Sequence, residues 1–122
     1  KCENLHGHRW RVVAEVGGET LDEEPQTRGM LIDFGDLKTA LKRLCDELDH
    51  SLIYEQDSLK PTTVEVLLDE QFRLVEVPFR PTAENLARDF FRKLRDRGFP
   101  VHRVEVYETP TNCAAYEDEP CR

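Results

Sequence analysis

Apolar and polar residues alternate along the first part of the chain. The even-numbered positions carry two histidines and then an apolar run, whereas charged residues take most of the odd-numbered ones: His6, His8, Trp10, Val12, Ala14 and Val16 against Arg9, Arg11 and Glu15. Strict alternation is typical of a strand with one buried face. Because residues i and i+2 of a strand point to the same side, both imidazoles are expected on the side that leads into the core.

Two segments have the spacing of amphipathic helices. The first covers residues 36–48, and Asp33 or Asp36 is expected to cap its N-terminus. The second follows Thr82, a natural N-cap, and Gly98 with Pro100 marks its end. The apolar stripes are Leu37, Ala40, Leu41, Leu44 and Leu48 in the first helix, and Leu86, Ala87, Phe90, Phe91 and Leu94 in the second.

Three further strands are expected, at residues 30–32, 101–109 and 114–116. Residues 51–81 are interpreted as a variable insertion with its own local structure, including a short helix near Thr63 and a strand-like alternation from Phe72 to Phe79. The order strand, strand, helix, helix, strand, strand predicts one α+β domain over residues 1–122, a four-stranded antiparallel sheet with two helices on one face. Open sheet edges must be covered or paired, which favours a homo-oligomer.

Composition narrows the classes of function. With 122 residues the chain has room for a single core. Its net charge of −8 argues against nucleic acid or an anionic membrane surface as partner, since both require a basic stripe. No apolar run approaches the ~18 residues that cross a bilayer. The four cysteines lack CxxC spacing and no signal peptide is visible, so we expect reduced thiols in the cytoplasm.

The histidine pair is the first candidate for chemistry. Two neutral imidazoles on one face suit a divalent transition metal, above all zinc. Cys2 lies four residues before His6 and reaches the same pocket if the chain turns near Asn4. A histidine on a strand is more often packed or exposed than a ligand, and a catalytic zinc usually has three protein ligands. From the residues alone, the metal site and simple packing both remain open.

Two other positions carry candidate acid–base or binding groups. Asp49 and His50 follow the first helix, where a carboxylate beside an imidazole holds its tautomer for proton transfer. The alternative is an exposed helix end at which a protonated histidine meets the negative end of the helix dipole. Glu108 shares the parity of Val104 and Val106, so its carboxylate is expected on the core side and needs a partner there. A surface glutamate at a frayed strand end is the alternative.

Five motifs in the same order resemble the 6-pyruvoyl-tetrahydropterin synthase / 6-carboxy-tetrahydropterin synthase family. They are Cys2-x-x-x-His6-Gly7-His8, Gly29 to Lys38, Leu48-Asp49-His50, Pro81 to Ala87 and Val106 to Thr109. Residues 55–80 are covered poorly by the resemblance. The spacing Cys-x-x-x-His-Gly-His is similar to the bacterial 6-carboxy branch, which feeds queuosine-type deazapurine synthesis. The pyruvoyl branch typically has more residues between its cysteine and first histidine.

The resemblance implies a tunnelling fold (T-fold), in which subunits join their sheet edges into a barrel and active sites lie between subunits. It also implies a zinc ion held by three histidines. Two of them match His6 and His8, and the third is expected on a strand upstream of Lys1.

The resemblance further assigns roles to single residues. Cys2 matches the catalytic base, and a neighbouring zinc ion would favour its thiolate. Asp49 and His50 match a proton-transferring pair. Glu108 matches the anchor for the pterin ring, whose 2-amino and N3–H groups suit a carboxylate. Thr82 matches a position that lines the pterin pocket, although its capping role explains it equally well.

The implied activity is that of a zinc-dependent carbon–oxygen and carbon–carbon lyase. It converts 7,8-dihydroneopterin triphosphate to 6-carboxy-5,6,7,8-tetrahydropterin, acetaldehyde and triphosphate, with zinc as Lewis acid at the side-chain hydroxyls. Candidates for phosphate contacts are Lys1, Arg9, Arg11 and Arg80. The near alternative is a 6-pyruvoyl-tetrahydropterin synthase that eliminates triphosphate. More remote alternatives are a non-catalytic metal-binding interaction module and a zinc hydrolase, for which the chain lacks an HExxH motif.

Overall fold

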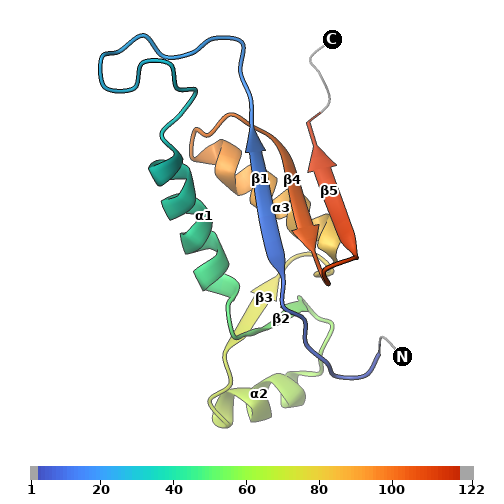
Figure 1. Ribbon diagram of the computed structural model, residues 1–122. Coiled ribbons are helices and arrows are strands. Elements are labelled where there is room, and N and C mark those ends of the chain that lie inside the picture. Colours follow the sequence, from blue (N-terminus) through green and yellow to red (C-terminus); the bar gives the residue numbers. More distant parts are fainter. Residues whose placement is uncertain (1–2, 119–122) are drawn as a thin grey trace.

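The computed structural model describes residues 3–118 of the chain. Within them the elements follow one another as β1 (Arg11–Val16), α1 (Phe34–Leu48), β2 (Leu52–Glu55), α2 (Pro61–Asp69), β3 (Leu74–Val77), α3 (Ala83–Asp96), β4 (Val101–Tyr107) and β5 (Cys113–Glu117) (Figure 1). The fold is therefore α+β, as the sequence predicts. None of the helices in this part of the chain has the length and apolar content needed to span a bilayer.

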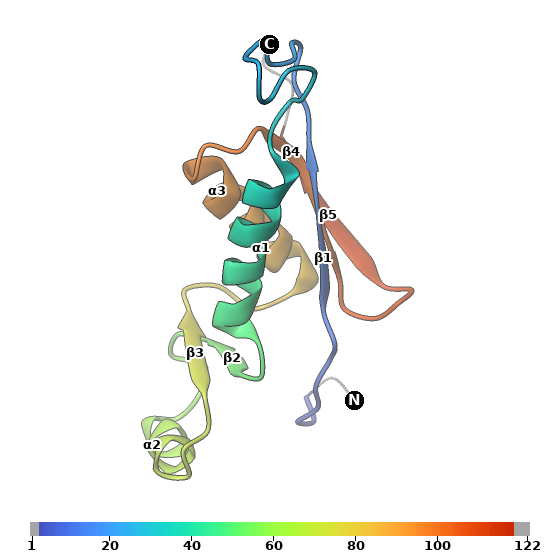
Figure 2. The same cartoon turned by 60° about the vertical axis from the view of Figure 1, so that its left-hand side comes forward.

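The main sheet is antiparallel, with strand order β1-β4-β5. Val106 of the central strand lies opposite Val12 of β1 and Ala114 of β5. Helices α1 and α3 cover the same face of this sheet (Figure 2). Val104 and Val106 alternate onto that face and are almost fully buried, as the period-2 pattern requires. The core therefore lies between β4 and the two helices.

Both long helices begin at the predicted caps. The Asp33 carboxylate accepts a hydrogen bond from the Gly35 amide at 2.7 Å, which decides between the two expected capping residues of α1. The Thr82 hydroxyl accepts one from the Asn85 amide at 3.2 Å at the start of α3. Gly98 adopts φ +89° after α3, a left-handed conformation that favours glycine.

The prediction of a four-stranded sheet is wrong, because residues 30–32 form no strand. The preceding loop folds on itself: the Asp22 amide donates to the Met30 carbonyl at 2.8 Å, and the Gly29 amide donates to the Asp22 carbonyl at 3.0 Å. Asp22 also accepts a hydrogen bond from the Thr27 hydroxyl. The Met30 carbonyl is thereby paired inside the loop and is not offered to the sheet. In residues 3–118 the main sheet has three strands.

The strand expected to begin at the histidine pair starts later, at Arg11. Arg11 pairs with Tyr107, the last residue of β4, so no partner strand extends beside the residues before it. The Glu108 amide instead donates to the Asn112 carbonyl at 2.9 Å in the turn toward β5. His6 and His8 consequently lie on an irregular segment that leads into β1.

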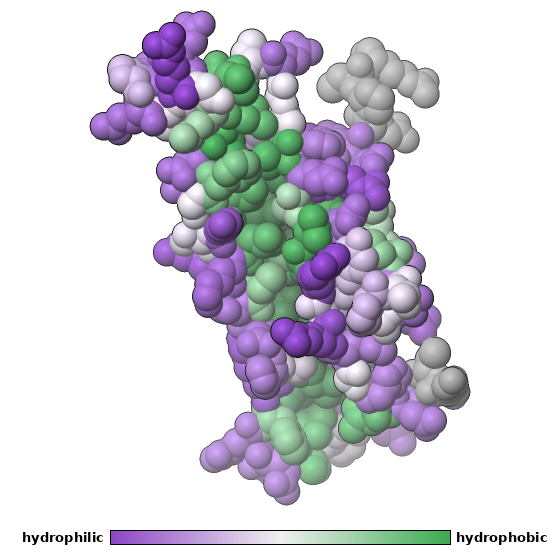
Figure 3. Space-filling model, in the orientation of Figure 1, coloured by the Kyte–Doolittle hydropathy of each residue, from purple (hydrophilic) through white to green (hydrophobic). Residues whose placement is uncertain are grey.

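Residues 51–81 form a separate excursion at one end of the molecule (Figure 1). The expected helix and the expected strand are present as α2 and β3, but β2 was not predicted. β2 pairs in parallel with β3, and α2 is the crossover between them. α2 has no buried residue, and apolar side chains are exposed at its end of the molecule (Figure 3), among them Val66, Leu68 and Phe72.

Candidate active site

One cavity brings together most of the residues that the sequence marks for chemistry. Its volume is about 850 Å³, and it lies where the segment before β1, the end of α1 and the start of β2 meet. His6 and His8 line it together with Asp49 and His50. Its apolar lining comes from β1 and the segment before it, from β4 and from both long helices, and includes Trp10, Val12, Leu48, Leu86, Phe90 and Val106. Figure 3 shows apolar surface between α1 and β1.

The two imidazoles of the HxH motif lie next to each other, although their segment is not a strand. Their ring centroids are 4.9 Å apart with the rings nearly perpendicular, and His8 makes a similar edge contact with Trp10 at 5.9 Å. His6 Nδ1 lies 2.6 Å from the Asn4 carbonyl. A carbonyl only accepts, so Nδ1 is the donor, and in the neutral imidazole Nε2 then offers its lone pair. A backbone partner of this kind is typical of metal-ligating histidines.

Glu108 reaches the histidine pair from the end of β4. Its Oε1 atom lies 3.4 Å from His8 Nε2, and the two side chains are 40% and 26% exposed, respectively. The parity of β4 therefore directs the carboxylate toward His8, whose imidazole is its partner. The contact joins the residue predicted to bind the pterin ring with one of the predicted metal ligands.

Asp49 and His50 lie in contact at the end of α1. His50 Nδ1 is 2.9 Å from Asp49 Oδ1, and the side chains are 93% and 64% exposed for His50 and Asp49, respectively. The Asp49 amide donates to the Cys45 carbonyl at 2.9 Å and ends the helix. His50 then has φ +50°, the left-handed conformation that commonly follows a helix but seldom with a residue other than glycine or asparagine. This turn sends the chain from α1 into β2.

Thr82 takes the capping position described above, and it is not among the residues that line the cavity, whereas its neighbour Pro81 is. Its capping role is thus visible in the structure, and its role in a pterin pocket stays a prediction. Cys2 lies outside the described residues, so its predicted role as the base stays a prediction as well.

The donor set fits zinc in kind but is not complete in residues 3–118. Two adjacent imidazoles, one of them fixed by a backbone carbonyl, are ligands that zinc prefers. Within this range no group of three or more His, Cys, Asp and Glu side chains is arranged to hold a metal ion. The described part of the chain therefore offers two candidate ligands, and the expected third histidine would have to come from elsewhere.

Cys45 also lines the cavity, and it was not predicted to belong to the site. Burial, followed by the nearby carboxylates of Asp46 and Asp49, raises the pKa of its thiol, so it stays protonated at neutral pH. The only available signal was its position one helical turn before Asp49. A thiol that remains protonated is suited to packing and unsuited to acting as a base.

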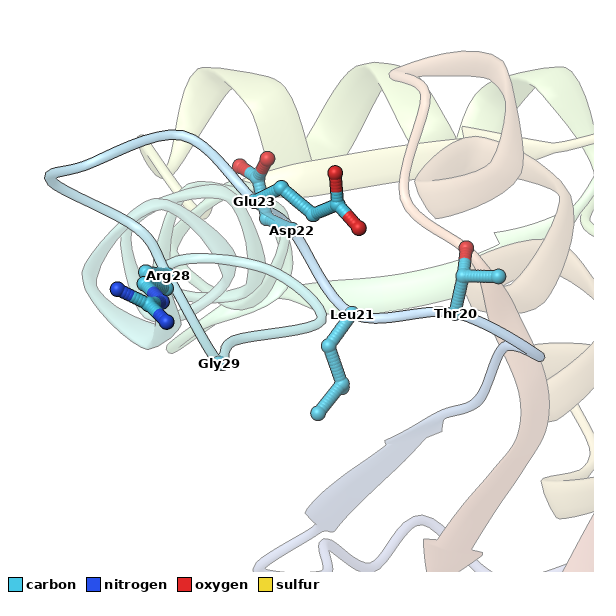
Figure 4. Close-up of a pocket in the computed structure, with 6 residues that line it drawn as sticks. All are labelled: Thr20, Leu21, Asp22, Glu23, Arg28 and Gly29. Atoms are coloured by element: carbon cyan, nitrogen blue, oxygen red, sulfur yellow. The ribbon is translucent and has the colours of Figure 1, made fainter.

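A second hollow lies in the loop between β1 and α1 (Figure 4), lined by Thr20, Leu21, Asp22, Glu23, Arg28 and Gly29. None of the residues predicted for the site lines this hollow. Hydrogen bonds from the Thr27 hydroxyl and the Glu24 amide lower the pKa of Asp22, which keeps this carboxylate ionised. The Asp22 carboxylate is thus engaged in holding the loop.

The cavity of this α+β domain thus brings together His6, His8, Asp49 and His50, with Glu108 against His8. The sequence model of the family described as 6-pyruvoyl tetrahydropterin synthase matches residues 1–119. The chain belongs to this family, which confirms the resemblance noted in its motifs.

Relatives named 6-carboxy-5,6,7,8-tetrahydropterin synthase match most of the chain. The Haemophilus influenzae protein is 36% identical, with 97% of this chain and 85% of the relative covered. The Aquifex aeolicus protein is 37% identical, with 98% and 77% covered. The fold is likewise similar to an uncharacterized protein from Wolinella succinogenes, with a TM-score of 0.81, 30% identity, and 97% of this chain and 81% of that one covered.

The 6-pyruvoyltetrahydropterin synthase of Plasmodium vivax has a TM-score of 0.68 at 19% identity, with 94% of this chain and 82% of that chain covered. At this identity the likeness concerns the fold alone. It agrees with the predicted T-fold subunit.

Proposed function

We propose that the chain is a 6-carboxy-5,6,7,8-tetrahydropterin synthase that acts on 7,8-dihydroneopterin triphosphate. The observation that carries the proposal is the meeting of His6 and His8 with Asp49 and His50 around one cavity, with Glu108 against His8. The relatives that match nearly the whole chain bear the same name. The 6-carboxy and pyruvoyl branches of the family are distinguished by their product rather than by their fold.

In this proposal zinc is the cofactor, held by His6, His8 and a third ligand. When bound, zinc supplies Lewis-acid polarisation of the oxygen atoms on the substrate side chain. The chain's own contribution begins at Asn4, whose carbonyl fixes the tautomer of His6 so that Nε2 offers its lone pair.

Asp49 and His50 serve as the proton-transferring pair. Asp49 Oδ1 lies 2.9 Å from His50 Nδ1, which leaves Nε2 of the imidazole to exchange protons with the substrate. Cys2 is the second proton-transferring group, acting as a thiolate on the opposite side of the substrate. Two groups on opposite sides permit a proton to be removed at one carbon and delivered at another.

Glu108 anchors the pterin ring. Its carboxylate has two acceptor oxygens, and the ring edge presents the 2-amino and N3–H donors at matching spacing. Because the Glu108 side chain is 40% exposed, its carboxylate is accessible to a ligand. Thr82 would border the same ring from the start of α3.

The acting form in this proposal is a cytoplasmic homo-oligomer with sites between subunits. The outer edges of β1 and β5 have no partner strand among the described residues. His50 is 93% exposed in the single chain, whereas proton transfer to a substrate is more effective in a site that excludes water. A neighbouring subunit would close the cavity over this pair. The product would enter queuosine-type deazapurine synthesis.

The second candidate is a 6-pyruvoyl-tetrahydropterin synthase, the activity that gives the matched family its description. The two reactions differ in one step. Both release triphosphate and reduce the ring internally, but the carboxy reaction also consumes water, cleaves a carbon–carbon bond of the side chain and releases acetaldehyde.

The proposal is tested by incubating the zinc-loaded protein with 7,8-dihydroneopterin triphosphate and identifying the pterin by mass spectrometry. The mass of 6-carboxy-5,6,7,8-tetrahydropterin supports the proposal. The mass of the pyruvoyl product would select the second candidate. Unchanged substrate with zinc bound would contradict both.

A further inference from the structure

We propose that Arg73 is a positioning residue that holds the Asp49–His50 pair in place, an inference that rests on the proposed function of that pair. Arg73 precedes β3, more than twenty residues after the pair in the chain. Its guanidinium donates to three carbonyls at the end of α1: those of Asp49 at 2.6 Å, Glu47 at 2.8 Å and Asp46 at 3.0 Å.

The end of α1 is short of positive charge. The last turn contains no basic residue, while Asp46, Glu47 and Asp49 are acidic. The final carbonyls of a helix lack partners within it and carry the negative end of the helix dipole. A planar guanidinium with several donors satisfies more than one of these carbonyls at once, which a single ammonium group does not.

Arg73 also bonds to the chain on the other side of His50. Its backbone carbonyl accepts a hydrogen bond from the Leu52 amide at 2.9 Å, at the start of β2. The residue therefore holds the backbone both before and after His50. The Ser51 hydroxyl adds a bond to the Leu48 carbonyl at 2.5 Å across the same turn.

His50 requires such support because its own side chain provides none. Its φ is +50°, which is unfavourable for a residue with a β-carbon, and 93% of its side chain is exposed, so packing does not hold it. Without Arg73 the turn would relax, and the imidazole would move away from the cavity. Residues 51–81 thereby gain a function, because they place Arg73 at the end of α1.

The test compares Arg73→Met with Arg92→Met in the full-length, zinc-loaded protein. Arg92 is exposed on α3, and no side-chain hydrogen bond or ion pair of Arg92 occurs among the described residues. Arg73→Met should lower kcat about 10- to 100-fold with KM nearly unchanged, because misplacing a catalytic group has this effect on rate. Arg92→Met should retain the wild-type kcat, and a wild-type kcat in Arg73→Met would overturn the proposal.

A double-mutant cycle separates positioning from mere support of the fold. If Arg73 acts through the imidazole, Arg73→Met should cause no further loss of kcat in a His50→Gln background. An additional loss of the full size would show that Arg73 acts elsewhere. Arg73→Lys should lose less than Arg73→Met, and if the methionine variant does not fold, a wild-type kcat in the lysine variant would refute the role of the guanidinium.

The same cycle distinguishes failure of this inference from failure of the proposed function. A loss in His50→Gln without a loss in Arg73→Met refutes the role of Arg73 alone. Full turnover in His50→Gln refutes the role assigned to the pair and the role of Arg73 with it.

Discussion

Replacing His50 by glycine should stabilise the fold and abolish turnover at the same time. His50 has φ +50°, and Gln71 has φ +65° in the turn between α2 and β3. Both residues adopt a left-handed conformation that glycine adopts without strain. Only His50 belongs to the proposed site, so Gln71→Gly is the matched control.

The size of the effect follows from the backbone. A residue with a β-carbon pays about 1–2 kcal/mol in the left-handed conformation, and glycine loses about 0.5–1 kcal/mol more conformational entropy on folding. Because 93% of the His50 side chain is exposed, little packing is lost. The exposed contact with Asp49 contributes little to stability. We expect a gain of about 0.5–1 kcal/mol in the free energy of unfolding of each variant.

Urea unfolding followed by circular dichroism measures this gain as a shift of the midpoint at an unchanged slope. His50→Gly should unfold at a higher urea concentration than the wild type and form no product. Gln71→Gly should gain similar stability and keep its kcat. If His50→Gly is less stable than the wild type while Gln71→Gly is more stable, the explanation of the turn at His50 by backbone strain is wrong.

Three further predictions address the proposed base, the substrate anchor and the core. Cys2→Ala should abolish turnover while zinc, measured by elemental analysis, stays bound; full activity would show that another group is the base. Glu108→Gln should raise KM about 30- to 100-fold, because an amide NH₂ would face a donor of the pterin ring, an unpaired contact worth about 2–3 kcal/mol; an unchanged KM in steady-state kinetics would refute the anchor. Leu94→Ala should destabilise the fold by about 3–5 kcal/mol in urea unfolding, since Leu94 is fully buried, whereas Leu68→Ala on exposed α2 should cost less than about 1 kcal/mol. Similar losses in both leucine variants would contradict the assignment of the core.

The parts of the fold that were predictable are those in which local chemistry and burial agree. Asp33 and Thr82 are strong N-caps, and the apolar stripes that follow them face the core, so both helices were found with their starts nearly correct. The alternation of Val104 and Val106 identified the central strand for the same reason.

The errors arise where long-range pairing decides the outcome. The apolar run at residues 30–32 has the composition of a strand, but the hydrogen bonds of Asp22 close the loop before it reaches the sheet. β2 was missed because its four residues are held by parallel pairing with β3, a partner that periodicity within one segment does not reveal. The start of β1 depends in the same way on where β4 ends.

The residues of the candidate site were likewise predictable only in part. The HxH motif, the Asp–His pair and Glu108 were visible as residue types at characteristic spacing, and the structure brings them to one region. Arg73 was not visible, because its importance depends on three carbonyls contributed by a distant helix. A sequence reveals which groups can perform chemistry more readily than which groups hold them in position.

The most direct test of the central claim is the ratio of acetaldehyde to triphosphate released from 7,8-dihydroneopterin triphosphate by the zinc-loaded protein. We predict one acetaldehyde for each triphosphate, with the release of both strongly slowed but still measurable in His50→Gln. Triphosphate without acetaldehyde would assign the chain to the pyruvoyl reaction. Release of neither product by the wild-type protein with zinc bound would contradict the proposed enzyme.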